Sequence, residues 1–290
     1  MPPPFLFWEG FCMVERILAR AAELLGSCPS VEGVVLGGSR ATGTAGEGSD
    51  VDIGVYYRGE PDLAALNRAA AQLDDAHREG LICPVGGWGE WVNCGGWLVV
   101  EGVPVDLILR DLDRVAQVVE RTERGQVAAH YQTGHPHAYV DGIYRGELAC
   151  CRVLYARTGG FLALKRRAER YPDALREALG QFFCFESGFS CMFAEKSAAQ
   201  GDLYYTAGHL FRAVSALNQV LFALNRQWCL NEKKAVARAG GFPLCPAGYQ
   251  ERVNRAFALL GSDPAAAAQQ VRALCQEVGA LWERRDTQGS

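Results

Sequence analysis

The chain has 290 residues, with 29 Lys or Arg against 33 Asp or Glu, so its formal net charge is −4. Hydrophobic residues make up 49% and charged residues 21%, which is typical of an ordered globular chain rather than a disordered one. This mildly acidic balance argues against a dedicated nucleic-acid binder. No run approaches the ~20 apolar residues that a membrane helix needs. We therefore expect neither a nucleic-acid partner nor a membrane partner.

The first third of the chain alternates helix and strand signals. Apolar residues at helical spacing predict a helix over 15–25, and alternating or short apolar runs predict strands at 31–36 and 51–57. A glycine-rich loop at 42–48 separates these strands, and an alanine-rich helix is expected at 62–77. The runs 96–101 and 103–109 predict a hairpin that turns near Glu101 and Gly102.

The rest of the chain reads as helical. We expect a helix at 112–123 and then, from residue 138 on, only helices: 138–154, 161–170, 174–199, 203–228, 233–239, 249–260 and 265–284. The predicted fold class is α+β, with a short mixed β-sheet flanked by helices, followed by an all-α helical bundle. The predicted domains are 1–130 and 131–290.

The cysteines indicate a reducing compartment. There are 11 of them, an odd number, and no Cys-x-x-Cys pair occurs. Most lie in apolar runs, where a free thiol behaves as a small hydrophobic residue. We therefore expect reduced core thiols in a cytoplasmic protein.

Two carboxylates open the second predicted strand. The first strand ends in a Gly38-Ser39 turn, where backbone N–H groups and a hydroxyl can meet phosphate oxygens. Asp50 and Asp52 are two residues apart, which on a strand places both side chains on one face. Their hard oxygen ligands suit Mg²⁺, which also binds phosphates. A polar loop without a metal is the other interpretation of an isolated Asp-x-Asp.

Asp106 lies inside the otherwise apolar run 103–109. A charge there is costly unless it is paired or metal-bound, or points outward from an edge strand. If this strand lies beside 51–57, Asp106 joins Asp50 and Asp52 in a cluster of three carboxylates. Two metal ions held there could clamp the attacking and leaving oxygens of a displacement at phosphorus.

The pattern Gly-Ser-x-Ala-x-Gly, five residues, then Ser-Asp-x-Asp, filled here by residues 38–52, resembles the polymerase-beta-type nucleotidyltransferase superfamily. It is similar in particular to the minimal-nucleotidyltransferase branch, which includes antibiotic nucleotidyltransferases. The motif covers about residues 33 to 57. The resemblance implies a nucleotidyltransferase fold for residues 1–130 and a helical C-terminal domain after it.

The resemblance also implies roles for single residues. Asp50, Asp52 and Asp106 would bind Mg²⁺, two ions in all, and Asp106 would bind the catalytic ion and help to deprotonate the acceptor hydroxyl. Gly38 and Ser39 would hold the triphosphate of ATP or another nucleoside triphosphate. Arg40 fills a variable position, at which a phosphate contact and a solvated turn residue are both open.

Further candidates lie outside the motif. Glu90, in the loop before the hairpin, could serve as the general base in place of Asp106. Lys233 follows a long helix and could reach a phosphate, although a solvated helix start is the simpler interpretation. For His130, His135 and His137 we leave open nucleotide or acceptor contacts, metal ligation and structural roles.

These features together predict an enzyme, a transferase that modifies a small molecule. We expect Mg²⁺-dependent transfer of a nucleoside monophosphate, AMP from ATP being favoured, to a hydroxyl of a small molecule, with release of pyrophosphate. An antibiotic is one candidate acceptor. The alternatives are AMP transfer to a protein side chain, as in toxin-neutralising members of the branch, and a non-catalytic nucleotide-binding protein.

Overall fold

The computed structural model describes residues 4–46 and 48–285. These described residues pack into two units: those within 1–120 and 144–170 form the first, and those within 121–143 and 171–290 form the second. The chain therefore leaves the first unit, enters the second and returns before it completes the first. The predicted domain division at residue 130 stays a prediction, and the packing units have other bounds.

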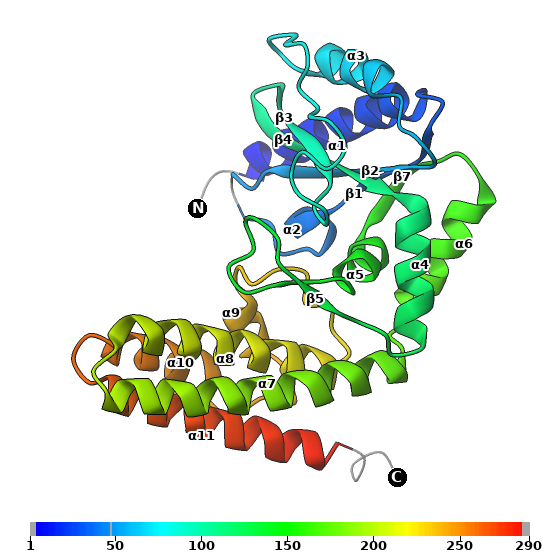
Figure 1. Ribbon diagram of the computed structural model, residues 1–290. Helices are drawn as coiled ribbons and strands as arrows, with labels where there is room; N and C mark the ends of the chain where they lie inside the picture. The colour runs from blue at the N-terminus through cyan, green and yellow to red at the C-terminus, as the bar shows by residue number, and fades with distance from the viewer. Residues whose placement is uncertain (1–3, 47, 286–290) are drawn as a thin grey trace. The chain divides into compact units, whose positions relative to one another are not determined.

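The first unit is built on a five-stranded mixed sheet with the strand order β3-β4-β2-β1-β7 (Figure 1). β2 and β4 are parallel, and the other neighbouring pairs are antiparallel. The strands are β1 (Val31–Leu36), β2 (Val51–Tyr57), β3 (Cys94–Val100), β4 (Val103–Asp111) and β7 (Arg152–Ala156). The helices of this part of the chain are α1 (Pro4–Gly26), α2 (Gly38–Ala41), α3 (Leu63–Leu73), α4 (Leu112–Glu123), α5 (Ile143–Cys150) and α6 (Gly159–Glu169).

One face of this sheet packs on α1 and α3. Alternate strand residues point to that face because side chains along a strand alternate between the two sides. Val51, Ile53 and Val55 of β2 are buried there together with Val105 and Leu107 of β4. The residues between them, Asp52 and Asp106 included, therefore lie on the opposite face.

Residues of α5 and α6 cover one end of the opposite face. The Tyr56 ring meets the Phe161 ring of α6 edge-on, with centroids 5.3 Å apart. Arg110 of β4 forms a bidentate ion pair with Glu147 of α5, with both N–O distances 2.8 Å. These contacts cover the end of β2 and β4 away from Asp52 and Asp106.

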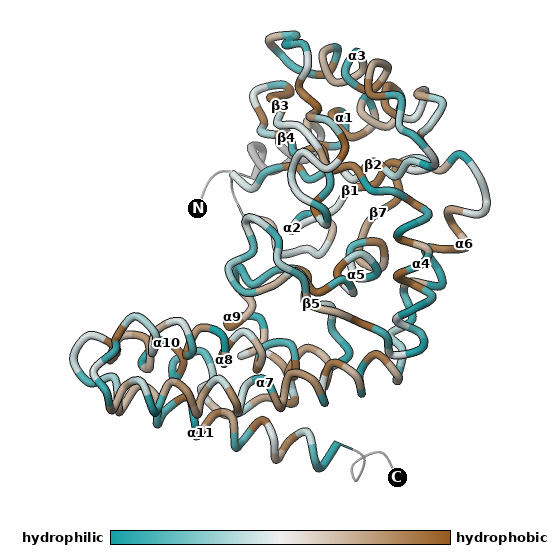
Figure 2. The backbone as a smooth tube through the Cα atoms, in the orientation of Figure 1, coloured by the Kyte–Doolittle hydropathy of each residue, from teal (hydrophilic) through white to brown (hydrophobic). Residues whose placement is uncertain are grey.

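The second unit is mainly helical and has its own apolar core. Figure 2 shows hydrophobic segments running through the strands of the first unit and along the helices of the second. No helix among residues 4–46 and 48–285 is long and apolar enough to cross a membrane. The elements of the second unit are β5 (Ala129–His130), β6 (Tyr139–Val140), α7 (Asp173–Ala199), α8 (Leu203–Leu224), α9 (Ala235–Ala239), α10 (Tyr249–Leu259) and α11 (Pro264–Glu283).

The fold confirms the predicted class, a mixed sheet with helices followed by a helical region. The prediction of a single helix over residues 138–154 is wrong. These residues contain β6, α5 and the start of β7. Arg152–Ala156 pairs with β1, Gly33 facing Ala156 and Leu36 facing Arg152. A pairing between segments this far apart in sequence overrides the local helical pattern.

Candidate functional site

The turn after β1 lies against the start of β2. The Gly37 N–H donates to the Asp52 carbonyl at 2.8 Å. Gly38, at the start of α2, has φ +58°, and a Cβ built there would overlap the Asp52 carboxylate. Only glycine accepts both this backbone conformation and this close approach. The sequence therefore brings the Gly38-Ser39 backbone directly beside the Asp52 side chain.

Arg40 supports the loop that leads into β2. Its guanidinium donates to the carbonyl of Ser49 at 2.6 Å and to the carbonyl of Asp50 at 3.1 Å. These two bonds fix the backbone just before Asp52, so the side chain has a clear structural role. Its predicted contact with a phosphate stays a prediction.

Asp52 and Asp106 are direct neighbours on the face of the sheet opposite α1 and α3. They are register partners in the parallel pair of β2 and β4, which confirms the expected strand neighbourhood. Burial, followed by the nearby charges of Asp106 and Asp50, raises the pKa of Asp52 to about 6. Burial and the charge of Asp50 also raise the pKa of Asp106. Two carboxylates held this close repel each other when both are ionised.

Asp50 contributes charge to this pair from an exposed position ahead of β2. In the part of the chain that the structure describes, no group of three His, Cys, Asp or Glu side chains is close enough to hold a metal ion. The structure therefore pairs Asp52 with Asp106 across β2 and β4, and the predicted metal-binding role of Asp50, Asp52 and Asp106 together stays a prediction. The pair alone suits Mg²⁺, because proteins commonly bind this ion through one or two carboxylates together with substrate phosphates and water.

Glu90 is not brought to this pair by any contact of the described residues. Its carboxylate pairs with Arg114 of α4 at 3.0 Å, and its backbone carbonyl accepts a bond from the same guanidinium at 2.6 Å. Arg114 follows the end of β4 that lies away from Asp106. The Glu90 side chain is 76% exposed. Its predicted role as a base stays a prediction.

The remaining candidates belong to the second unit. The Glu232 carboxylate lies 3.2 Å from His135 Nδ1 and accepts a bond from the backbone N–H of His137 at 3.3 Å. Burial, more than any nearby charge, lowers the pKa of His137. His130 Nε2 lies 3.6 Å from an Asp141 carboxylate oxygen. Glu232 thus organises the histidine segment, a role that the sequence analysis missed.

Lys233 is exposed next to that carboxylate. Its backbone N–H bonds to the Asn231 side chain at 2.8 Å, and α9 begins only at Ala235, because Lys234 has a left-handed φ of 62°. The helix therefore begins two residues later than the expected start at residue 233. The predicted phosphate contact of Lys233 stays a prediction.

The sequence analysis also missed the Arg110–Glu147 pair. The charge of Glu147 is one of the causes that raise the pKa of Asp52. A signal for it exists, since Arg110 interrupts the apolar β4 strand four residues after Asp106 and so shares its face. What the local pattern could not supply was its partner, which comes from α5.

A family model matches the part of the chain that carries this arrangement. Residues 14–123 match the family model described as the nucleotidyltransferase domain. This part of the chain thus has the sequence features of a nucleotidyltransferase domain. Among solved structures, the chain is similar to a nucleotidyltransferase-like protein from Exiguobacterium sibiricum 255-15. The identity is 11% and the TM-score 0.42, over 91% of this chain and 72% of that one. No curated protein matches.

Proposed function

We propose that the protein transfers a nucleoside monophosphate, AMP from ATP being favoured, to a hydroxyl of a small molecule and releases pyrophosphate. The observation that carries this proposal is the Asp52–Asp106 pair beside the Gly38-Ser39 turn, inside the nucleotidyltransferase domain. Burying two carboxylates together is costly. A site that binds a divalent cation and a phosphate compensates that cost.

Different residues of the chain would bind the metal and the phosphates. Asp50, Asp52 and Asp106 would hold Mg²⁺, two ions in all. When bound, the metal supplies charge stabilisation to the phosphoryl oxygens. Gly38, Ser39 and Arg40 would hold the β- and γ-phosphates, and Lys233 is proposed as a further phosphate ligand.

The reaction is a displacement at the α-phosphorus. The acceptor oxygen forms a bond to that phosphorus, and the bond from it to the bridging oxygen of pyrophosphate breaks. The hydroxyl proton passes to Asp106, the carboxylate that the resemblance assigns to deprotonation of the acceptor. Glu90 is the second candidate for this proton and would first have to leave Arg114.

Pyrophosphate release from each of the four common nucleoside triphosphates, with Mg²⁺ and a panel of hydroxyl compounds, tests the proposal. We expect release with the full chain and none with Asp52→Asn or Asp106→Asn. A nucleotide labelled at the α-phosphate separates the acceptors, because label retained on protein would indicate transfer to a protein side chain. Turnover by the Asn variants at the wild-type rate would exclude the proposed site. Nucleotide binding without any turnover would favour a non-catalytic binding protein.

Ser39 offers a binding test that needs no acceptor. If its hydroxyl bonds to a phosphate, Ser39→Ala should weaken binding of a magnesium–nucleotide complex about tenfold or more, since a bond to a charged group contributes ~1.5–3 kcal/mol. Ser27→Ala is the matched control, because the Ser27 hydroxyl bonds to a carbonyl at the end of α1. Equal affinities in calorimetry for wild type and Ser39→Ala would remove Ser39 from the site.

A further inference from the structure

A tryptophan stands in line with the carboxylate pair. Trp97 of β3 is the register partner of Asp106, and Asp106 is the register partner of Asp52. Directly paired residues of neighbouring strands point to the same face, with Cβ atoms about 4.5–5.5 Å apart. Asp52, Asp106 and Trp97 therefore form one row across three strands. Trp97 is 64% exposed, a large exposure for so large and apolar a side chain.

A second tryptophan is stacked on the first. The Trp88 and Trp97 rings lie 4.8 Å apart at an angle of 28°. Trp88 lies over Gly95, where a Cβ would overlap its ring. Asn93 fixes the turn that carries Trp88: its carbonyl accepts the Trp88 N–H at 2.9 Å, and its side chain donates to Tyr57 Oη at 3.0 Å. The paired indoles are thus prearranged rather than loose.

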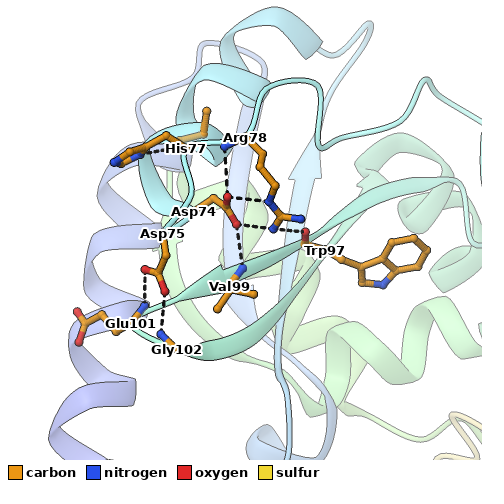
Figure 3. A network of polar contacts seen from close by, with 9 residues as sticks. Asp74, Asp75, His77, Arg78, Trp97, Val99, Glu101 and Gly102 are labelled. Carbon is orange, nitrogen blue, oxygen red and sulfur yellow. Dashed lines mark hydrogen bonds and ion pairs between the residues drawn. The ribbon is translucent and has the colours of Figure 1, made fainter.

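Hydrogen bonds to Arg78 and Asp74 also fix the backbone of β3 around Trp97. The Arg78 guanidinium donates to the Trp97 carbonyl at 3.3 Å, and the buried Asp74 carboxylate accepts the Val99 N–H at 3.0 Å. Figure 3 shows the Trp97 indole pointing away from this network. The backbone of Trp97 is therefore fixed while its ring faces solvent, the condition for a preformed contact surface.

The order of Asp52, Asp106 and Trp97 in this row indicates which of the two substrates contacts the Trp97 ring. Gly38 lies against Asp52, so the proposed triphosphate occupies the β1 side of the row. In an in-line displacement, the attacking oxygen and the leaving pyrophosphate lie on opposite sides of the phosphorus. The acceptor then approaches from the Asp106 side, where Trp97 is the next residue of the row.

We infer that Trp97, backed by Trp88, is the acceptor platform, and that the acceptor is a small alcohol whose hydroxyl is carried on or next to a ring. The flat face of that ring packs on the indole, and its hydroxyl points toward Asp106. This inference rests on the proposed function. It makes Trp97 a specificity-determining residue, which favours ring compounds over open-chain alcohols with the same number of carbons and hydroxyls.

Matched probes separate ring recognition from general alcohol binding. Myo-inositol and sorbitol carry equal numbers of carbons and hydroxyls, as a ring and as an open chain, and cyclohexanol and 1-hexanol form a second such pair. Ligand-observed NMR would measure their binding to the full chain, with and without Mg²⁺ and α,β-methylene-ATP. We expect the cyclic member of at least one pair to bind more tightly. Trp97→Ala should weaken that binding about tenfold, and Trp97→Phe should restore most of it.

Val99→Ala is the matched control, because Val99 lies on the same face of β3, is 40% exposed, and pairs with Pro104 rather than Asp106. It should leave binding of the cyclic probe unchanged, and all these variants should bind α,β-methylene-ATP like wild type. Equal binding of cyclic and open-chain probes, or none by any probe, would overturn the inference. So would a Trp97→Ala variant that loses the nucleotide analogue instead, which would make Trp97 a base platform. Failure of the wild type to bind the analogue would count against the proposed function, not against ring binding at Trp97.

Discussion

The carboxylate of Asp52 has a higher pKa in the native state than in the unfolded chain, about 6 against an ordinary value of 3.8. Between about pH 4 and 6 the native state therefore binds more protons than the unfolded state. The free energy of unfolding must then fall as the pH rises through this window, and the loss persists above it. The site costs stability at neutral pH until a cation occupies it.

Replacing Asp52 with Asn should remove that cost. Above pH 6, in EDTA, we expect the free energy of unfolding of Asp52→Asn to exceed that of wild type by about 1–2 kcal/mol, a value reduced for partial exposure to solvent. Near pH 4 the difference should vanish. Urea unfolding at both pH values measures this. Glu60→Gln, an exposed carboxylate before α3, is the control. A variant less stable than wild type at pH 7.5 would contradict the prediction.

At the scale of single elements, β3 depends on the end of α3. Asp74 caps this helix, is 1% exposed, and accepts bonds from the Val99 and Arg78 backbone N–H groups and from the Arg78 guanidinium (Figure 3). The Arg78 hydrogen bond outweighs burial and holds the pKa of Asp74 well below its usual range. This contribution to stability is present above the ordinary pKa of an aspartate and is lost as the pH falls below it.

Asp74→Asn should therefore lower the free energy of unfolding by about 2 kcal/mol at pH 7, the value of a hydrogen bond to a charged group. Its neighbour provides the comparison. Asp75 accepts the backbone N–H groups of Glu101 and Gly102, both at 2.8 Å, but from an exposed position. Asp75→Asn should cost less, since water can replace the lost partner. Denaturant unfolding of both variants measures the difference, and equal losses would show that burial of Asp74 adds nothing.

Several elements were predictable because their signals are local. β1, β2, α3 and the β3–β4 hairpin follow from alternation, helical spacing and turn residues. The pairing of Asp52 with Asp106 was also predictable, since both carboxylates interrupt apolar strands. β7 was not, because the local pattern of Arg152–Ala156 carries no information on its partner β1. The conformation of the loop before Asp50 was not predictable either, because Arg40 sets it through a hydrogen bond to a residue ten positions away.

At the scale of the whole molecule, the first unit is completed by residues that follow its excursion into the second. Glu147 neutralises Arg110, which is 4% exposed. Arg145 is 1% exposed and donates to the carbonyls of Val119 and Ala168, among others. A charge buried without its partner is strongly destabilising. Residues 144–170 are therefore part of the first unit's core and not an attachment to it.

Shortened chains test this organisation. A chain ended after residue 130 keeps the motif 38–52 but lacks α5, β7 and α6, so Arg110 loses Glu147 and β1 loses an edge strand. We expect it to lack a cooperative thermal transition. A chain ended after residue 170 retains these elements and should unfold cooperatively. Circular dichroism with heating measures both. Cooperative unfolding of the shorter chain would show that residues 144–170 are dispensable.

The divided first unit also sets an order of events during translation. The sheet lacks its β7 edge, and Tyr56 lacks its Phe161 cover, until the ribosome has added residues 121–170. At about 5–20 residues per second, this takes a few seconds. During that interval β1 presents an unpaired edge, which is the kind of surface that recruits other strands. The nascent chain is thus most exposed to mispairing before the helices from α7 onward are synthesised, and a chaperone that binds β1 would act during this interval.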